Sequence, residues 1–268
     1  MRKTSVTCCI TLIVALLSLP VGAAETDNVW MKTDRFSFGV GIFFVEEDTE
    51  ITLSGDLGLG TNIDFQDDLG FDEDEEVLRF VGHYRFKPRH RINFGYWDLS
   101  QDSTATLTKG IIFDDSFFPA GTTVESDLSF TVINILYTYS FYQTPKLDLG
   151  VSTGVNIYEF DSKIEASAIA IEESGDGTAP FPVFGIRAIW EFKPKWRLAA
   201  SWDYFEIESG DTEGQVIDVL IGVEHQTWKN AGLGFGYNDV SIDAEDQEEG
   251  DELDWDYNGF FAYVRFSR

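Results

Sequence analysis

Cysteine and histidine are both scarce in this chain. The two cysteines, Cys8 and Cys9, lie within the first 24 residues, so a mature chain that begins after residue 24 has no thiol. Disulfide bonds, thiol catalysis and cysteine metal sites are therefore excluded for that mature chain. Histidine occurs three times in 268 residues, so few positions offer the commonest general base of enzymes.

The chain also lacks a long apolar run and, outside its first 24 residues, any helix-period segment of useful length. Residues 1–24 combine two basic residues at 2–3, an apolar run over 10–19 and small residues at 22–24. This pattern predicts a secretory signal peptide, because the run is shorter than the roughly 20 residues that a membrane-spanning helix needs. We expect one mature domain over 25–268.

Positive charge is scarce as well. The chain has 19 Lys and Arg against 47 Asp and Glu, a formal net charge of -28. This balance argues against nucleic acid as a partner and against general binding to anionic lipid. Disorder is excluded too, since 15% of the residues are aromatic and 43% are hydrophobic, enough to build a core.

The remaining signal is alternation with a period of two, which predicts β-strands. Most of these segments approach the 9 to 11 residues that a tilted membrane strand needs. In the last segment, Phe260, Val264 and Phe266 fall on one face and Phe261 and Arg265 on the other. If lipid covers the apolar face, no edge is left open, so we expect this strand to pair with the first. The ten predicted strands are 35–45, 77–86, 91–99, 128–141, 147–157, 183–192, 196–205, 216–225, 232–237 and 253–266.

Connections between these segments alternate between short and long. Three of the four short ones contain proline, which suits a turn. The long ones hold 37 of the 47 acidic residues and only two bases, Lys109 and Lys163. Charge is thus sorted to one end of the molecule, and strand-like stretches within the long connections predict that strands continue there as hairpins. The long connections are 46–76, 101–127, 161–180, 206–214 and 239–256.

Together these features resemble a bacterial outer-membrane β-barrel. The resemblance implies an all-β, transmembrane, antiparallel up-and-down β-barrel of about ten strands, with long acidic extracellular loops and short periplasmic turns. It also implies a monomer in the outer membrane, in contact with membrane lipid and lipopolysaccharide and handled by the barrel assembly machinery during biogenesis. One departure is that Ser267 and Arg268 follow Phe266, whereas such barrels usually end on the aromatic residue.

A narrower resemblance rests on two segments, Arg85–Phe94 and Asp67–Phe71. They are similar to segments of a group of proteobacterial barrel proteins, and this likeness implies no activity.

Inward-facing charges are the first candidate site. A barrel of about eight strands is just wide enough to be filled by side chains, and ten strands add little room. Buried arginines also need carboxylate partners. A filled, ion-paired interior is therefore favoured over a narrow selective pore, which stays the alternative. The predicted lumen-lining residues, to which the inward Arg197 belongs as well, are Arg79, His83, Arg85, Arg187, Glu191, Asp203, Asp218, Glu224 and Arg265.

The acidic segment 239–256 is the second candidate site, because clustered carboxylates suit Ca²⁺ or Mg²⁺. Its spacing approaches that of an EF-hand but departs from it at the first, third and last positions. Two interpretations stay open: loosely bound divalent cations, or a solvated surface of like charges. The candidate metal ligands are Glu245, Glu249, Asp251 and Asp256.

The three histidines bear on catalysis. Ten-stranded outer-membrane proteases need an Asp/His constellation at the loop-side rim, and His83, His90 and His225 all fall toward the short turns instead. We therefore expect a non-enzymatic barrel with acidic surface loops and a structural or interaction role, needing no cofactor. The alternatives are a narrow pore for small solutes and a membrane-embedded hydrolase that acts on lipid or peptide.

Overall fold

The computed structural model describes residues 34–54, 60–113, 116–210, 212–246 and 251–268. The predicted signal peptide lies outside these ranges. Within them the chain forms thirteen strands, and no helix there is long and apolar enough to cross a membrane.

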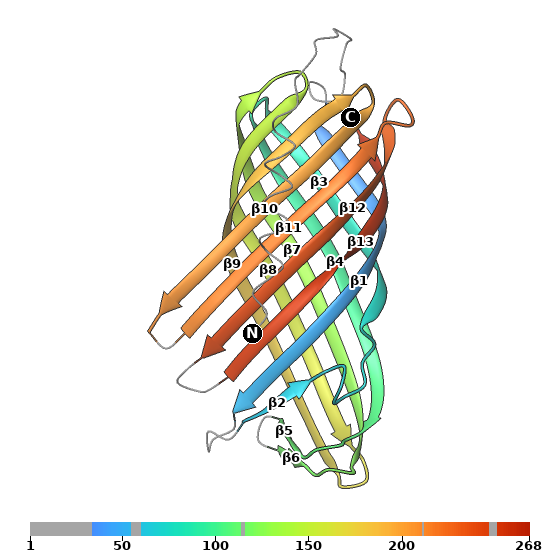
Figure 1. Ribbon diagram of the computed structural model, residues 1–268, viewed down its shortest axis with the longest axis vertical. Helices are drawn as coiled ribbons and strands as arrows, with labels where there is room; N and C mark the ends of the chain where they lie inside the picture. Colours follow the sequence, from blue (N-terminus) through green and yellow to red (C-terminus); the bar gives the residue numbers. More distant parts are fainter. Residues whose placement is uncertain (1–33, 55–59, 114–115, 211, 247–250) are drawn as a thin grey trace.

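Ten of the strands form one closed antiparallel barrel (Figure 1). Each predicted strand coincides with one of them, and the last pairs with the first, from Ser37 opposite Ser267 to Thr52 opposite Glu252. The pairing reaches the end of the chain, where Arg268 and Phe36 exchange backbone hydrogen bonds of 2.9 and 3.0 Å. The barrel strands are β1 (Phe36–Ser54), β3 (Asp74–Lys87), β4 (His90–Thr106), β7 (Thr123–Gln143), β8 (Leu147–Ala166), β9 (Ile171–Lys193), β10 (Trp196–Ser209), β11 (Thr212–His225), β12 (Ala231–Asp246) and β13 (Asp251–Ser267).

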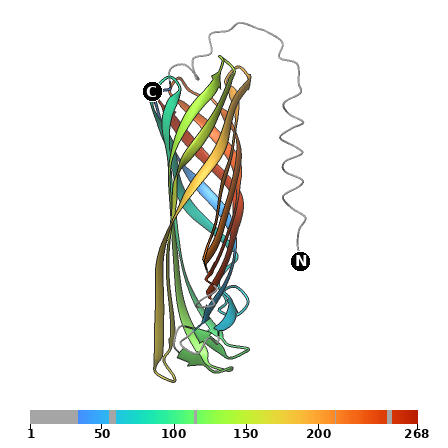
Figure 2. The ribbon, with the colours of Figure 1, turned by 90° about the vertical axis from the view of Figure 1, so that its left-hand side faces the viewer.

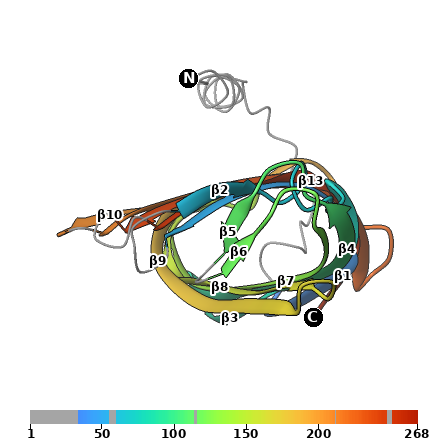
Figure 3. The ribbon, with the colours of Figure 1, turned by 90° about the horizontal axis from the view of Figure 1, so that it is seen from below.

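The other three strands lie at the loop end of the barrel. β2 (Gly60–Asp64) pairs with the outer part of β1. β5 (Ile111–Phe113) and β6 (Ser116–Phe118) form a hairpin, which crosses the mouth of the barrel in Figure 3. The loop end is therefore covered by the chain's own segments.

An apolar band surrounds the outside of the barrel on the side of the short turns, which lie at the top of Figure 1. The period of two places large hydrophobic side chains outward there, and they stay exposed because no other part of the described chain covers them. A closed barrel with such a band is a membrane-spanning barrel. Strongly exposed examples are Leu78, Phe141, Phe184, Ile186, Phe235, Phe260 and Phe266.

Beyond this band the strands continue as a long sleeve, seen in Figure 2. β8 and β9 are 20 and 23 residues long, about twice what a membrane crossing needs. The expected continuation of the strands as hairpins is thus confirmed.

The inside of the barrel changes character along its length. Inward residues near the short turns are mostly charged or polar, whereas inward residues of the sleeve are mostly apolar and pack on β2, β5 and β6. Fully buried residues of this outer core include Val45, Ile63, Phe65, Leu69, Trp97, Ile111, Phe113, Phe118, Val124, Phe130 and Trp255.

Candidate functional site: the closed lumen

The nine residues predicted to line the lumen all face the inside of the barrel. Glu191 and Arg85 lie nearest the short turns, with Glu191 buried and the Arg85 side chain 12% exposed. The other seven surround a cavity of about 200 Å³, and they are Arg79, His83, Arg187, Asp203, Asp218, Glu224 and Arg265.

Glu224 on β11 is the centre of one ion-pair network. Its carboxylate lies 2.6 Å from Arg197 on β10 and 2.9 Å from Arg265 on β13, and the hydroxyl of Tyr263 donates a hydrogen bond to it. Arg265 also contacts Asp34, just before β1, at 2.6 Å. Because both arginines contact Glu224 and Arg265 also contacts Asp34, the network joins β10, β11, β13 and the segment just before β1.

A second pair joins β9 to β10. Arg187 Nη2 lies 2.7 Å from Asp203 Oδ2, and Ser152 Oγ on β8 donates a hydrogen bond to the other carboxylate oxygen at 3.1 Å. Asp203 sits directly opposite Gly185, where a Cβ atom would collide with the carboxylate. The glycine thus makes room for the buried acid.

Asp148 on β8 is the centre of a third network. Its side chain is fully buried and its Oδ2 atom lies 3.3 Å from Arg85 and 3.4 Å from Arg91. Gln143 donates a further hydrogen bond to the same oxygen at 3.2 Å. These donors offset the cost of burying the carboxylate, since a buried charge without partners is strongly unfavourable.

Arg79 on β3 connects the polar lumen to the apolar sleeve. Its guanidinium donates to Asn238 Oδ1 at 2.7 Å and lies over the rings of Phe43 and Phe261, 4.9 and 5.0 Å from their centroids. Asn238 in turn donates to Asp218 at 2.7 Å. The arginine is thus solvated by an amide and two aromatic faces in place of water.

Three charged members of these networks are missing from the predicted set: Asp34, Arg91 and Asp148. Strand parity could have found the latter two, because Arg91 shares a face with Asn93 and Asp148 with Gly150. Asp34 precedes the first predicted strand, so no alternation marks it.

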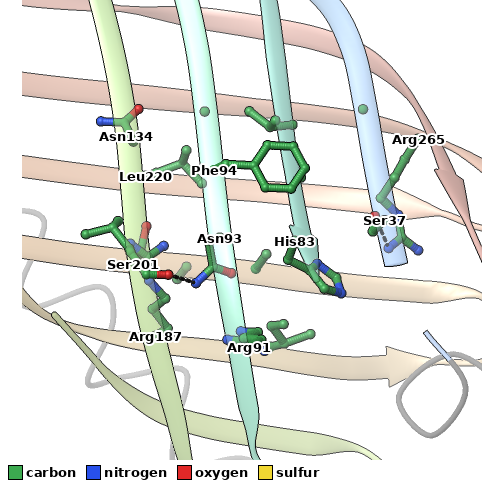
Figure 4. A pocket seen from close by; sticks show the side chains of 18 of the residues that line it. Ser37, His83, Arg91, Asn93, Phe94, Asn134, Arg187, Ser201, Leu220 and Arg265 are labelled. Atoms are coloured by element: carbon green, nitrogen blue, oxygen red, sulfur yellow. Dashed lines mark hydrogen bonds between the residues drawn. The ribbon is translucent and has the colours of Figure 1, made fainter. Parts of the chain in front are cut away.

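The cavity among these networks is polar on one side and narrow. Figure 4 shows His83, Arg91 and Asn93 projecting into it from β3 and β4, with Arg187 behind them. Arg265 donates to Ser37 Oγ at 3.0 Å along one wall. The space would hold a few water molecules and is too small to be a wide channel.

An aromatic layer forms the part of the outer core that lies next to this cavity. It consists of inward rings from five strands, and its members contact one another across the lumen. Phe130 on β7 stacks on Trp255 on β13 with centroids 4.2 Å apart, and Trp97 on β4 meets Tyr257 on β13 at 5.1 Å. Residues of the aromatic layer are Phe43, Trp97, Phe130, Tyr158, Trp255 and Tyr257, all at most 5% exposed.

The histidines do not meet at the loop-side rim. His83 lines the lumen cavity. His90 and His225 lie by the short turns on the outer surface, where the His90 ring contacts the Tyr137 hydroxyl at 2.6 Å and the His225 ring packs on Trp196 at 4.6 Å. The structure therefore does not bring a histidine to the place where a protease of this architecture would need one.

The candidate metal ligands are only partly described. Glu249 and the side chain of Asp251 lie outside the described part of the structure. Glu245 and Asp256 both face outward, but Asp256 lies opposite Ser241, four residues from Glu245 along β12 and hence roughly 13 Å away. In the part of the chain that the structure describes, no three His, Cys, Asp or Glu side chains are grouped to hold a metal ion.

Carboxylates nevertheless form a continuous surface just beyond the apolar band. Asp254 on β13 lies opposite Asp243 on β12 and opposite Glu50 on β1. Burial, followed by repulsion from Asp256, Asp243 and Glu50, raises the pKa of Asp254 to about 6. We call Asp254, Asp243, Glu50, Asp256 and Asp48 the acidic face. Asp48 lies opposite Asp256.

Comparisons with known proteins agree on the fold. No protein-family model matches the chain, and a search of curated proteins finds no match by sequence. Among solved structures, the outer membrane protease OmpT from Escherichia coli is similar with a TM-score of 0.56 and 10% sequence identity, over 87% of this chain and 96% of that one.

Two further solved structures are similar with lower scores. The attachment invasion locus protein Ail of Yersinia pestis covers 87% of this chain and 99% of its own at 9% identity, with a TM-score of 0.34. The P. putida toluene transporter TodX covers 91% of this chain and 94% of its own at 10% identity, again with a TM-score of 0.34. The likeness to a narrower proteobacterial group stays a prediction.

These proteins differ in role, so the similarity supports the architecture of this chain and not its function. The chain forms a closed ten-stranded antiparallel barrel with an apolar outer band and short turns at one end. All three are features of outer-membrane barrels. The chain therefore has the fold of the bacterial outer-membrane β-barrel proteins, and its apolar band places it in that membrane.

Proposed function

We propose that the chain is a non-enzymatic, non-conducting outer-membrane barrel with a structural or interaction role, which presents its acidic face outside the membrane. The stack of Phe130 on Trp255 carries this proposal, because it joins distant walls of the barrel in the middle of the lumen. The ion-pair networks on the membrane side of the aromatic layer support the same conclusion. A solute would have to displace both.

The partner that fits the acidic face is the polar layer of the outer leaflet. Asp254, Asp243 and Glu50 lie side by side on the outer face of the barrel, on the loop side of the apolar band. Lipopolysaccharide is anionic there, so contact requires Ca²⁺ or Mg²⁺ to bridge carboxylates and phosphates. The proposal thus gives the acidic face an interaction role, for which no preformed metal site is needed.

A planar bilayer recording tests the proposal. Purified wild-type protein should give no steady current, and its barrel should still be folded by the mobility difference between boiled and unboiled samples. Large, stable conductance would overturn the proposal. Small or flickering currents would favour the narrow pore, for which the cavity of about 200 Å³ is the supporting observation.

A further inference from the structure

The barrel wall is split between β9 and β10 in the sleeve. Their register ends at the pair Phe184 and Tyr204. Beyond that pair, β9 stays paired with β8 as far as Ile171, and β10 with β11 as far as Ser209. Figures 1 and 3 show the outer ends of β10 and β11 leaning away from the ring. The split begins at the edge of the apolar band that adjoins the sleeve, where Phe184 is 66% exposed.

A pocket of about 400 Å³ lies beside this split, between the inner face of β9 and the inner faces of β12 and β13. Its walls are mainly aromatic. The ring of Tyr158 meets those of Phe181 and Trp255 at 5.8 and 5.7 Å, with Phe160 and Leu253 completing the surface. A concave, largely apolar space of this size is typical of sites for small molecules.

Small residues on β9 keep the pocket open. Gly177 and Ala179 face inward, opposite Phe160 and Tyr158, and both line the pocket. A Cβ atom at Gly177 would meet nothing within 4 Å. The sequence therefore leaves space where a larger side chain would fit without strain.

Charge restricts what this space accepts. Among the described residues that line it, the charged ones are Glu245 and Glu252, which lie opposite each other on β12 and β13. Their side chains are exposed and point to the outer face, so they stand at the rim of the pocket, where their negative charge repels an approaching carboxylate or phosphate. The aromatic walls offer faces and edges for stacking.

We propose that this pocket binds a small, uncharged hydrophobic molecule, aromatic in preference, that enters through the split between β9 and β10. The pocket lies on the outer side of the aromatic layer, so the proposal holds whether or not the lumen conducts. Capture at this position would draw the molecule from the outer leaflet or from the medium just above it.

Fluorescence titration of the full chain in lipid nanodiscs tests the proposal. 1-Naphthol is the uncharged aromatic probe and 1-naphthoate its anionic counterpart, with empty nanodiscs subtracted for partition into lipid. Wild-type protein should bind naphthol saturably, with quenching of tryptophan emission, and should bind naphthoate at least about tenfold more weakly.

Two variants fill the pocket, Gly177→Leu and Ala179→Leu, and Asp176→Leu is the matched control because it adds the same side chain to the opposite, exposed face of β9. Folding of each is checked by heat-dependent gel mobility. Naphthol affinity should fall about tenfold or more in the filled variants and stay at the wild-type value in the control.

Three results would overturn the proposal. The first is naphthol uptake equal to that of empty nanodiscs in every variant. The second is saturable naphthol binding that persists unchanged when the pocket is filled, and the third is naphthoate binding as tight as naphthol binding. The first shows lipid partition only, the second a site elsewhere, and the third a site that is not selective for uncharged molecules.

Discussion

The indole ring of Trp255 lies 4.2 Å from the phenyl ring of Phe130, with the two ring planes 13° apart. Around the barrel, their strands are separated by β1, β3 and β4 on one side and by β8 to β12 on the other. The contact therefore crosses the lumen. The other rings of the aromatic layer surround this contact. A continuous channel through the lumen would therefore require whole aromatic side chains to be displaced or deleted.

Replacing both Phe130 and Trp255 by alanine should open a path through the aromatic layer. The expected result is a steady current in planar bilayers where the wild type gives none, with a loss of roughly 3–5 kcal/mol of stability for each large ring. The matched control is Phe235→Ala with Phe260→Ala, a stacked pair on the lipid-facing surface. Equal conductance in both double variants would show that the aromatic layer does not close the lumen.

Arg187→Ala should destabilise the barrel because it leaves Asp203, whose side chain is 3% exposed, without its cation. Breaking a buried pair typically costs about 3–5 kcal/mol, and the partial exposure of Arg187 sets the expectation at the lower end. Thermal unfolding followed by gel mobility measures it. The double variant Arg187→Ala, Asp203→Ala should regain part of the loss. If the double variant is no more stable than the single one, the two residues are not coupled.

Stability should fall as pH rises from about 5 to 8. Burial, then repulsion from Glu75, raises the pKa of Glu47 from 4.5 to about 8. The folded chain thus keeps a proton that the unfolded chain releases, so the stabilisation is full below pH 4.5 and is lost as pH rises toward 8.

Glu47→Gln tests this assignment, since glutamine keeps the shape and cannot ionise. The variant should melt a few degrees above the wild type at pH 8 and close to it at pH 5. Glu46→Gln, one residue away on the outer face, should keep the wild-type slope. A Glu47→Gln variant with an unchanged slope would place the pH dependence elsewhere.

Calcium should stabilise the protein more than sodium chloride of equal ionic strength. Monovalent salt only screens the acidic face over a Debye length of about 8 Å at physiological strength, whereas a divalent cation bridges its carboxylates. Melting temperatures of wild type and of Asp243→Asn with Asp254→Asn give the comparison. No extra effect of calcium in the wild type would leave the acidic face a solvated surface, and an equal effect in both proteins would place the cations elsewhere.

Alternation in the sequence was enough to predict ten strands, the closing pair and the side on which most residues lie. The physical reason is local, because successive side chains of a strand point to opposite faces and the face in contact with lipid must be apolar. Phe260 and Arg265 were assigned to the correct faces by parity alone. The same argument limited the interior to a filled or narrow lumen, since the strand number sets the diameter.

Only the tertiary structure decided which of the inward residues meet. Asp148 pairs with arginines from two other strands, and Trp255 stacks on Phe130 of a distant wall. Those contacts depend on the stagger of neighbouring strands and on the curvature of the closed wall, which a period of two does not encode. The end of the β9–β10 register at Phe184 is of the same kind: both strands continue beyond this pair, but each is paired only with its other neighbour there, and the alternation in the sequence does not mark this point.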